Sequence, residues 1–161
     1  LVLIGLVGLC PEWYGACFGF VVTGYIAGTL ASGRLTLRLG PPRMVLMGAL
    51  LGTAAGTLMA ILALAGVHSV WAILLPMVVF MVATGLVMPN AIGGALAPYP
   101  KMAGAASALM GFVQMSLSAL VGIAVGHAYA GTAVPMASAI ALCGGAVLMS
   151  YFFLVRGAGP A

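Results

Sequence analysis

Few side chains in this sequence are suited to contact a ligand, and Gln114 is the most prominent of them. It lies near the middle of a long apolar run. Burying an amide in hydrocarbon is costly unless it finds hydrogen-bond partners, so Gln114 should face other helices or a water-filled cavity. Two hypotheses follow: a contact with a substrate in a cavity, or a hydrogen bond that joins two helices. Its neighbours Phe112 and Met115 are of types that suit a promiscuous apolar pocket, although packing or contact with lipid explains either of them singly.

Thr23 and Tyr25 are a second pair of polar side chains within an apolar run. Both have a hydroxyl group, and the ring of Tyr25 also offers a face for stacking. The functional interpretation is a contact with a ligand in a cavity, and the alternative is structural packing between helices.

The sequence has almost no group for acid–base chemistry in its apolar runs. Glu12 is the single acidic residue, and it precedes the first long run. The sequence contains no phosphate-binding loop, no zinc-binding pattern and no recognisable nucleophile constellation. We therefore predict that the protein is not an enzyme and holds neither a metal nor an organic cofactor. A membrane-embedded enzyme would need a polar catalytic cluster within the apolar runs, and none is visible.

The composition indicates that lipid is the solvent for much of the protein surface. Hydrophobic residues make up 65% of the 161 residues and charged residues only 4%, whereas soluble domains have roughly 25% charged residues. So few charges cannot cover the exterior of a soluble fold. The net charge of +4 comes from basic residues that are spread along the chain, so no nucleic-acid partner is expected.

Five apolar runs are each long enough to form a helix that crosses the bilayer, which takes about 20 residues. They cover residues 14–32, 44–67, 70–92, 103–128 and 133–155. Residues 1–9 form a shorter apolar stub, which we interpret as the last turns of a further helix. The sequence thus predicts an all-α, polytopic membrane helix bundle.

The basic residues predict how this bundle is oriented. If all five runs cross the bilayer, every Lys and Arg falls on one side, namely Arg34, Arg38, Arg43, Lys101 and Arg156. Loops rich in Lys and Arg are cytoplasmic in membrane proteins. We therefore predict a multi-pass protein of the inner (plasma) membrane with a cytoplasmic C-terminus.

Glycine spacing predicts where helices approach each other closely. Gly48, Gly52 and Gly56 repeat every four residues on one face of the second run. Two further pairs have the same spacing, Gly24/Gly28 and Gly122/Gly126. Small residues at this spacing let helix backbones come together in a membrane.

Pro89 and Asn90 lie near the inner end of the third run. A proline within a helix frees a backbone carbonyl and bends the helix, and the side chain of Asn90 can satisfy groups freed in this way. The two interpretations are a kink that takes part in gating and an ordinary helix end.

The segment 33–43 (GRLTLRLGPPR) resembles the cytoplasmic loop motif of the major facilitator superfamily, which joins the second and third helices of each half. The matching residues are Gly33, Arg38, Gly40 and Arg43. Leu37 stands where that family has an acidic residue, so a charge relay from this loop to a neighbouring helix is not expected.

Three other segments are similar to the Bcr/CflA-like drug/proton antiporters of that superfamily. Residues 10–15 (CPEWYG) resemble the external entry to helix eight, with Cys10 in place of a serine, and residues 88–91 (MPNA) and 105–114 resemble helices ten and eleven. The resemblance covers nearly the whole chain. It implies the C-terminal half of a major facilitator fold, consisting of the end of helix 7 and helices 8–12, with cavity-lining helices that contain Thr23, Tyr25 and Gln114.

The resemblance implies secondary transport, with export of drug-like small molecules by alternating access and the proton gradient as the energy source. The expected partners are the lipid bilayer, a small-molecule substrate and the N-terminal half of the same transporter. That half would contain the carboxylate for proton coupling, because the five runs contain none. Two alternatives remain open: a facilitator-family exporter of another solute, such as a sugar or amino acid, and a self-contained membrane scaffold or subunit.

Overall fold

The computed structural model describes residues 11–66, 69–128 and 134–155, which form helices and contain no strand. The elements are α2 (Pro11–Leu39), α3 (Pro41–Leu64), α4 (Val70–Leu96), the 3-10 helix η1 (Pro100–Met102), α5 (Ala103–His127), α6 (Val134–Ser150) and the π-helical turn η2 (Tyr151–Val155). Within these ranges, five helices are long and apolar enough to cross a membrane. The predicted all-α membrane helix bundle is therefore confirmed.

The sequence predicted a loop over residues 33–43, but in the structure only Gly40 lies between α2 and α3. Helix α2 continues to Leu39 because arginine and leucine, which dominate its last turns, are good helix formers. The chain then turns at Gly40, whose φ of 79° is a conformation that glycine adopts without strain. Pro41 and Pro42 begin α3, where their missing N–H groups cost no hydrogen bond.

The residues of the expected loop motif are consequently spread over two helices and the turn between them. Gly33 and Arg38 lie on α2, Gly40 forms the turn, and Arg43 lies in the first turn of α3. Helix α4 likewise continues to Leu96, beyond the boundary at residue 92 that the apolar run indicated.

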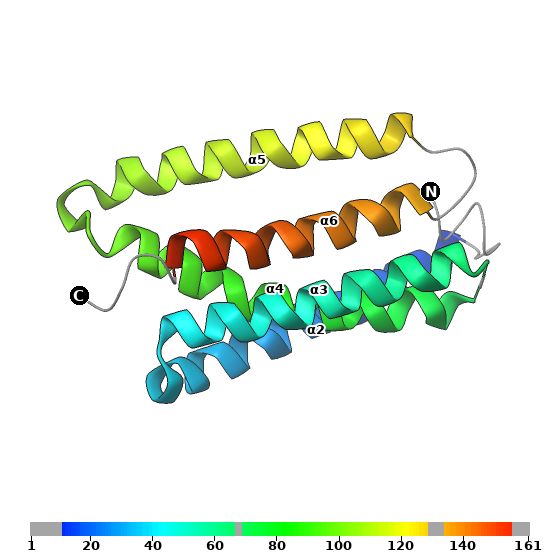
Figure 1. Ribbon diagram of the computed structural model, residues 1–161, viewed down its shortest axis with the longest axis horizontal. Coiled ribbons are helices and arrows are strands. Elements are labelled where there is room, and N and C mark those ends of the chain that lie inside the picture. The colour runs from blue at the N-terminus through cyan, green and yellow to red at the C-terminus, as the bar shows by residue number, and fades with distance from the viewer. Residues whose placement is uncertain (1–10, 67–68, 129–133, 156–161) are drawn as a thin grey trace.

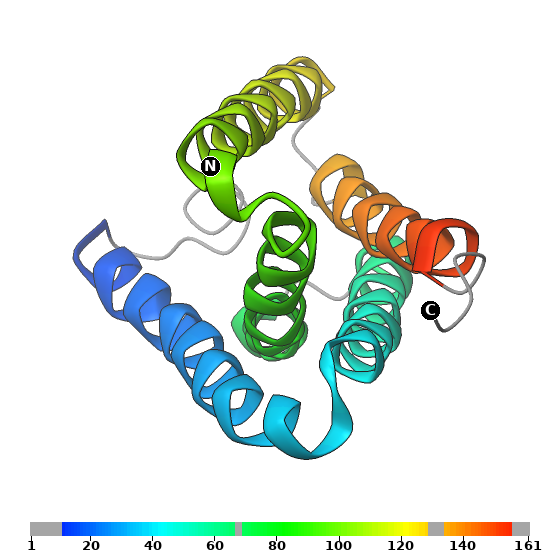
Figure 2. The ribbon, with the colours of Figure 1, turned by 90° about the vertical axis from the view of Figure 1, so that its left-hand side faces the viewer.

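Four of the long helices pack together and the fifth stands apart (Figures 1 and 2). Helix α4 packs against both α2 and α3, and α6 packs against the other side of α3. Figure 2 shows the helices end-on, with α4 in the centre between α2 and α3, and with α5 set apart from α2 and α3. No described residue of α5 is buried, so the other described helices leave most of the surface of this helix uncovered.

Glycines bring α2 and α4 into backbone contact. A Cβ atom placed on Gly24 would lie 2.7 Å from the carbonyl oxygen of Val78, and one on Gly28 would overlap the carbonyl of Val82. From the opposite side, a Cβ on Gly85 would lie 2.6 Å from the carbonyl oxygen of Tyr25. Close approach of this kind maximises van der Waals contact between membrane helices, for which lipid supplies little hydrophobic driving force.

The three regularly spaced glycines of α3 face two different neighbours. A Cβ on Gly48 would lie 2.9 Å from the carbonyl oxygen of Ala83 on α4, whereas one on Gly56 would lie 2.9 Å from the Cα atom of Ala141 on α6. Gly52 lies between them, and a Cβ there would make only an ordinary contact of 3.4 Å with the side chain of Ala83. One small-residue face of α3 thus packs against two helices at once.

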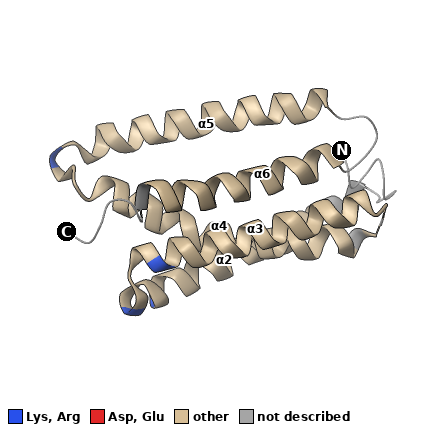
Figure 3. Cartoon of the chain, viewed as in Figure 1, with Lys and Arg blue, Asp and Glu red and all other residues tan. Residues whose placement is uncertain are grey.

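The described Lys and Arg residues lie at one end of the bundle, as Figure 3 shows. This end includes the turn between α2 and α3 and the connection between α4 and α5. The stub at residues 1–9, Cys10 and Arg156 lie outside the described residues. The cytoplasmic orientation of the basic end stays a prediction.

Candidate functional site

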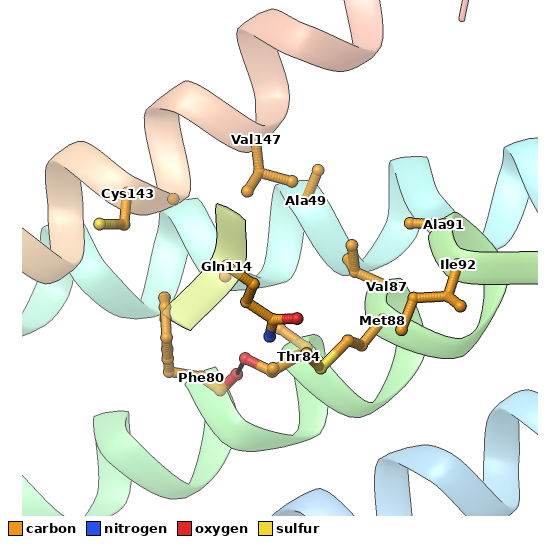
Figure 4. Close-up of a pocket in the computed structure, with 14 residues that line it drawn as sticks. Ala49, Phe80, Thr84, Val87, Met88, Ala91, Ile92, Gln114, Cys143 and Val147 are labelled. Carbon is orange, nitrogen blue, oxygen red and sulfur yellow. Dashed lines mark hydrogen bonds between the residues drawn. The ribbon is translucent and has the colours of Figure 1, made fainter. Parts of the chain in front are cut away.

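A cavity of about 310 Å³ lies between α3, α4, α5 and α6. Its size falls at the lower end of the range that small-molecule sites occupy, roughly 300–1,000 Å³. Figure 4 shows the residues that line it. They are Gly48, Ala49, Gly52, Phe80, Ala83, Thr84, Val87, Met88, Ala91, Ile92, Gln114, Cys143, Gly144 and Val147.

Gln114 is the residue of α5 that lines this cavity. Its half-buried side chain extends from α5 towards Thr84 and Met88 on α4 (Figure 4). The hydroxyl of Thr84 donates its hydrogen bond to the carbonyl of Phe80, at 2.9 Å. Within the described ranges, the Gln114 amide has no hydrogen-bond partner of its own. An amide in this position is available to a ligand.

The rest of the cavity wall is largely apolar, with one face of α4 on one side and small residues of α3 and α6 on the other. Helix α4 presents Phe80, Thr84, Met88 and Ala91 at spacings of three and four residues, which place them on one helix face. The opposite wall consists mostly of small residues, namely Gly48, Ala49 and Gly52 of α3 and Cys143, Gly144 and Val147 of α6. An apolar cavity with a single free amide suits a largely apolar molecule that has one or two hydrogen-bonding groups.

The structure places Thr23 and Tyr25 away from this cavity. The Thr23 side chain is exposed, and its hydroxyl donates to the carbonyl of Phe20 on the same helix at 2.6 Å. The Tyr25 side chain is half-buried, and its backbone carbonyl accepts a hydrogen bond from the hydroxyl of Thr29. Neither residue lines the cavity, so their predicted contact with a ligand would require a surface that α2 shares with protein outside this chain.

Phe112 and Met115 also lie away from the cavity, although they are close to Gln114 in the sequence. Their side chains are 69% and 68% exposed. A helix turns by about 100° per residue, so residues two positions apart lie on nearly opposite faces. Phe112 therefore faces away from the other described helices, and Met115 lies well to the side of Gln114.

Asn90 forms a polar joint between α4 and α2, which is a role that its position next to Pro89 did not predict. The Asn90 side chain is only 7% exposed. Its Nδ2 donates to the Ser32 hydroxyl and to the carbonyl of Leu86, both at 2.7 Å, and its Oδ1 accepts from the Thr36 hydroxyl at 2.9 Å. The amide thus ties two turns of α2 to α4.

Pro89 itself is exposed, and α4 contains a second internal proline, Pro76. Each proline removes one N–H from the helix ladder. In a membrane such a loss is tolerated when side chains or neighbouring helices compensate for it. The carbonyl that loses its helical partner to Pro89 is that of Gly85, four residues earlier. The Asn90 side chain donates to the carbonyl of Leu86 instead, so the expectation that it satisfies the freed group is not met. The gating role of Pro89 and Asn90 stays a prediction.

Sequence reasoning missed most of the cavity wall and the partners of Asn90. The face of α4 that includes Phe80 and Thr84 has a regular helical spacing, which was the available signal. Ser32 and Thr36 are also one turn apart, but only the packing of α2 against α4 reveals that both reach the same amide. No group of His, Cys, Asp and Glu residues suited to a metal occurs among the described residues.

Two curated proteins are similar to this chain. A bicyclomycin resistance protein homolog of Haemophilus influenzae is 25% identical over 154 residues, which are 96% of this chain and 38% of that protein. Multidrug resistance protein D of Escherichia coli is 43% identical over 60 residues, which are 37% of this chain and 15% of that protein. The chain thus spans well under half the length of either relative. No family model matches it, and no solved structure matches it significantly.

Proposed function

We propose that this chain is part of a drug efflux transporter, on the basis of its resemblance to Bcr/CflA-like drug antiporters of the major facilitator superfamily. The similarity to a bicyclomycin resistance protein homolog and to a multidrug resistance protein supports this proposal. The whole transporter exports largely apolar small molecules in exchange for protons, and works by alternating access between the two sides of the membrane. The observation that supports this most directly is the apolar cavity between α3, α4, α5 and α6, with the unpaired amide of Gln114 directed into it.

The remainder of the transporter supplies what this chain lacks. Proton coupling requires a titratable group within the membrane, and Glu12 is the only acidic residue here. It lies in the first turn of α2, at the end of the helix. The coupling carboxylate therefore belongs to a part of the transporter outside these residues, and the exposed face of α5 is a surface that the other part can cover.

The proposal is tested by expressing the full-length gene in cells that lack their own efflux pumps. We expect lower accumulation of some dyes or antibiotics in a broad panel, and recovery of accumulation when a protonophore collapses the proton gradient. Unchanged accumulation across the panel, with the protein demonstrated in the membrane, would refute drug export. Export that persists after the gradient is collapsed would refute proton coupling alone.

A Gln114→Leu substitution should weaken export of substrates that have a hydrogen-bonding group. One hydrogen bond is worth about 1 kcal/mol, which corresponds to roughly a fivefold change in affinity. We therefore expect the concentration needed for half-maximal transport to rise by about that factor, as measured in membrane vesicles. The matched control is Ser116→Ala, because Ser116 is polar and lies two residues away on the opposite face of α5. An equal effect of both substitutions would contradict a contact between Gln114 and the substrate.

A further inference from the structure

The arginines near the end of α2 have no counter-ion among the side chains of this chain. The sequence has five basic residues and a single acidic one, Glu12. Glu12 and Arg34 belong to the same helix, and 22 residues of α-helix separate them by roughly 33 Å. A charge at that distance is beyond the Debye length of physiological salt, which is about 8 Å. The positive charge at this end of the bundle (Figure 3) must be balanced from outside the chain.

Two of these arginines share a surface hollow with apolar side chains. The hollow is lined by Arg34, Leu35, Leu37, Arg38 and Leu39, and has a volume of about 630 Å³. Arg34 and Arg38 are four residues apart, so their guanidinium groups leave the helix on the same face. Leu37 is 89% exposed. A ligand that fits this lining needs an anionic group for the arginines and hydrocarbon for the leucines.

The length of α2 places this hollow in the lipid headgroup layer. Its 29 residues extend over about 43 Å, whereas the hydrocarbon core of a bilayer is about 30 Å thick and the whole bilayer with headgroups is about 40–45 Å thick. If the apolar N-terminal part of α2 crosses the hydrocarbon core, the last turns of the helix, with Arg34 and Arg38, lie at the level of the lipid phosphates. The exposed Leu37 and the half-buried Leu35 and Leu39 then lie near the boundary with the acyl chains.

We propose that Arg34 and Arg38 form a binding site for an anionic phospholipid. The two guanidinium groups hold the phosphate, which carries the negative charge of the headgroup, and the leucines contact the upper part of an acyl chain. Helix α3 begins directly after this end of α2, and the positive end of its helix dipole adds to the same potential. Bound lipid of this class stabilises the turn between α2 and α3.

The test compares the full-length protein in nanodiscs of phosphatidylcholine with nanodiscs of an equal mixture of phosphatidylcholine and phosphatidylglycerol. Native mass spectrometry counts the phospholipids retained by the protein, and thermal unfolding reports its stability. We expect the wild-type protein to retain phosphatidylglycerol preferentially and to unfold at a higher temperature in the mixture. The Arg34→Gln/Arg38→Gln variant should lose roughly tenfold in retention of phosphatidylglycerol, because each basic residue contributes to this attraction, and its stability should no longer depend on the lipid.

The matched control is Arg43→Gln/Lys101→Gln, which removes the same charge from the same end of the bundle but leaves the hollow intact. This variant should keep most of the preference for phosphatidylglycerol. An equal loss in both variants would overturn the site in favour of a diffuse surface potential. A loss of stability in Arg34→Gln/Arg38→Gln that is the same in both lipids would also overturn it. Such a result would indicate that the arginines form ion pairs with acidic groups of the protein and not with lipid. A wild-type protein without any preference for phosphatidylglycerol would overturn it directly.

Discussion

A Gly85→Ala protein should unfold at a clearly lower temperature than the unsubstituted protein, although the same change stabilises most helices. Alanine is favoured over glycine within a helix by about 1 kcal/mol. At Gly85 the added methyl group would lie 2.6 Å from the carbonyl oxygen of Tyr25 and 2.8 Å from the backbone nitrogen of Thr29. Backbone atoms of a packed helix cannot move aside as a flexible side chain does, so α2 and α4 must separate. Overpacking of this kind costs about 1–3 kcal/mol.

The matched control for Gly85→Ala is Gly93→Ala on the same helix. A Cβ at Gly93 meets no described atom within 4 Å, so this substitution should be neutral or slightly stabilising. Thermal unfolding of the full-length protein in nanodiscs measures both, together with the amount of protein that reaches the membrane. If Gly85→Ala were as stable as Gly93→Ala, the close contact between α2 and α4 would be refuted.

Glycine spacing predicted that helices approach closely, but it did not predict which of them do so. The pairs Gly24/Gly28 and Gly122/Gly126 have the same spacing in the sequence. The first pair contacts the backbone of α4, whereas a Cβ on either glycine of the second pair meets no described atom within 4 Å. The difference lies in the partner helix, because a close contact needs a matching surface such as that around Gly85. A pattern within one helix contains no information about that surface.

The apolar runs were sufficient to predict the helices, because every backbone polar group must be paired within the membrane and a helix pairs them locally. They did not predict where α2 ends, because Arg34 and Arg38 continue the helix beyond the apolar stretch. The candidate site was predicted less completely. Gln114 lines the cavity, but Phe112 and Met115 were grouped with it by proximity in the sequence, whereas the 100° turn per residue separates them in space.

An Asn90→Leu substitution should destabilise the bundle by about 1–2 kcal/mol, through loss of the joint between α2 and α4. Hydrogen bonds between membrane helices contribute about 0.6 kcal/mol on average and up to about 1.7 kcal/mol. Asn90 makes two such bonds, to the hydroxyls of Ser32 and Thr36. Leucine has a similar volume, so the change removes the polar contacts without leaving a large cavity. Thermal unfolding of the full-length protein in nanodiscs measures the effect.

A double-mutant cycle with Thr36→Val distinguishes the loss of the hydrogen bond between Thr36 and Asn90 from any other effect of the substitution at position 90. If the hydrogen bond between Thr36 and Asn90 is responsible, Asn90→Leu should cost less in the Thr36→Val background than in the unsubstituted protein. The matched control is Thr23→Val, because the hydroxyl of Thr23 is exposed and bonds only to its own helix. That substitution should show no coupling to Asn90. Strict additivity of Thr36→Val and Asn90→Leu would contradict the joint, since two residues that share a hydrogen bond cannot contribute independently. Coupling between the two substitutions would instead confirm that Asn90 and Thr36 join α2 and α4 near the basic end of the bundle. Any sliding of these two helices past each other would then have to break this contact.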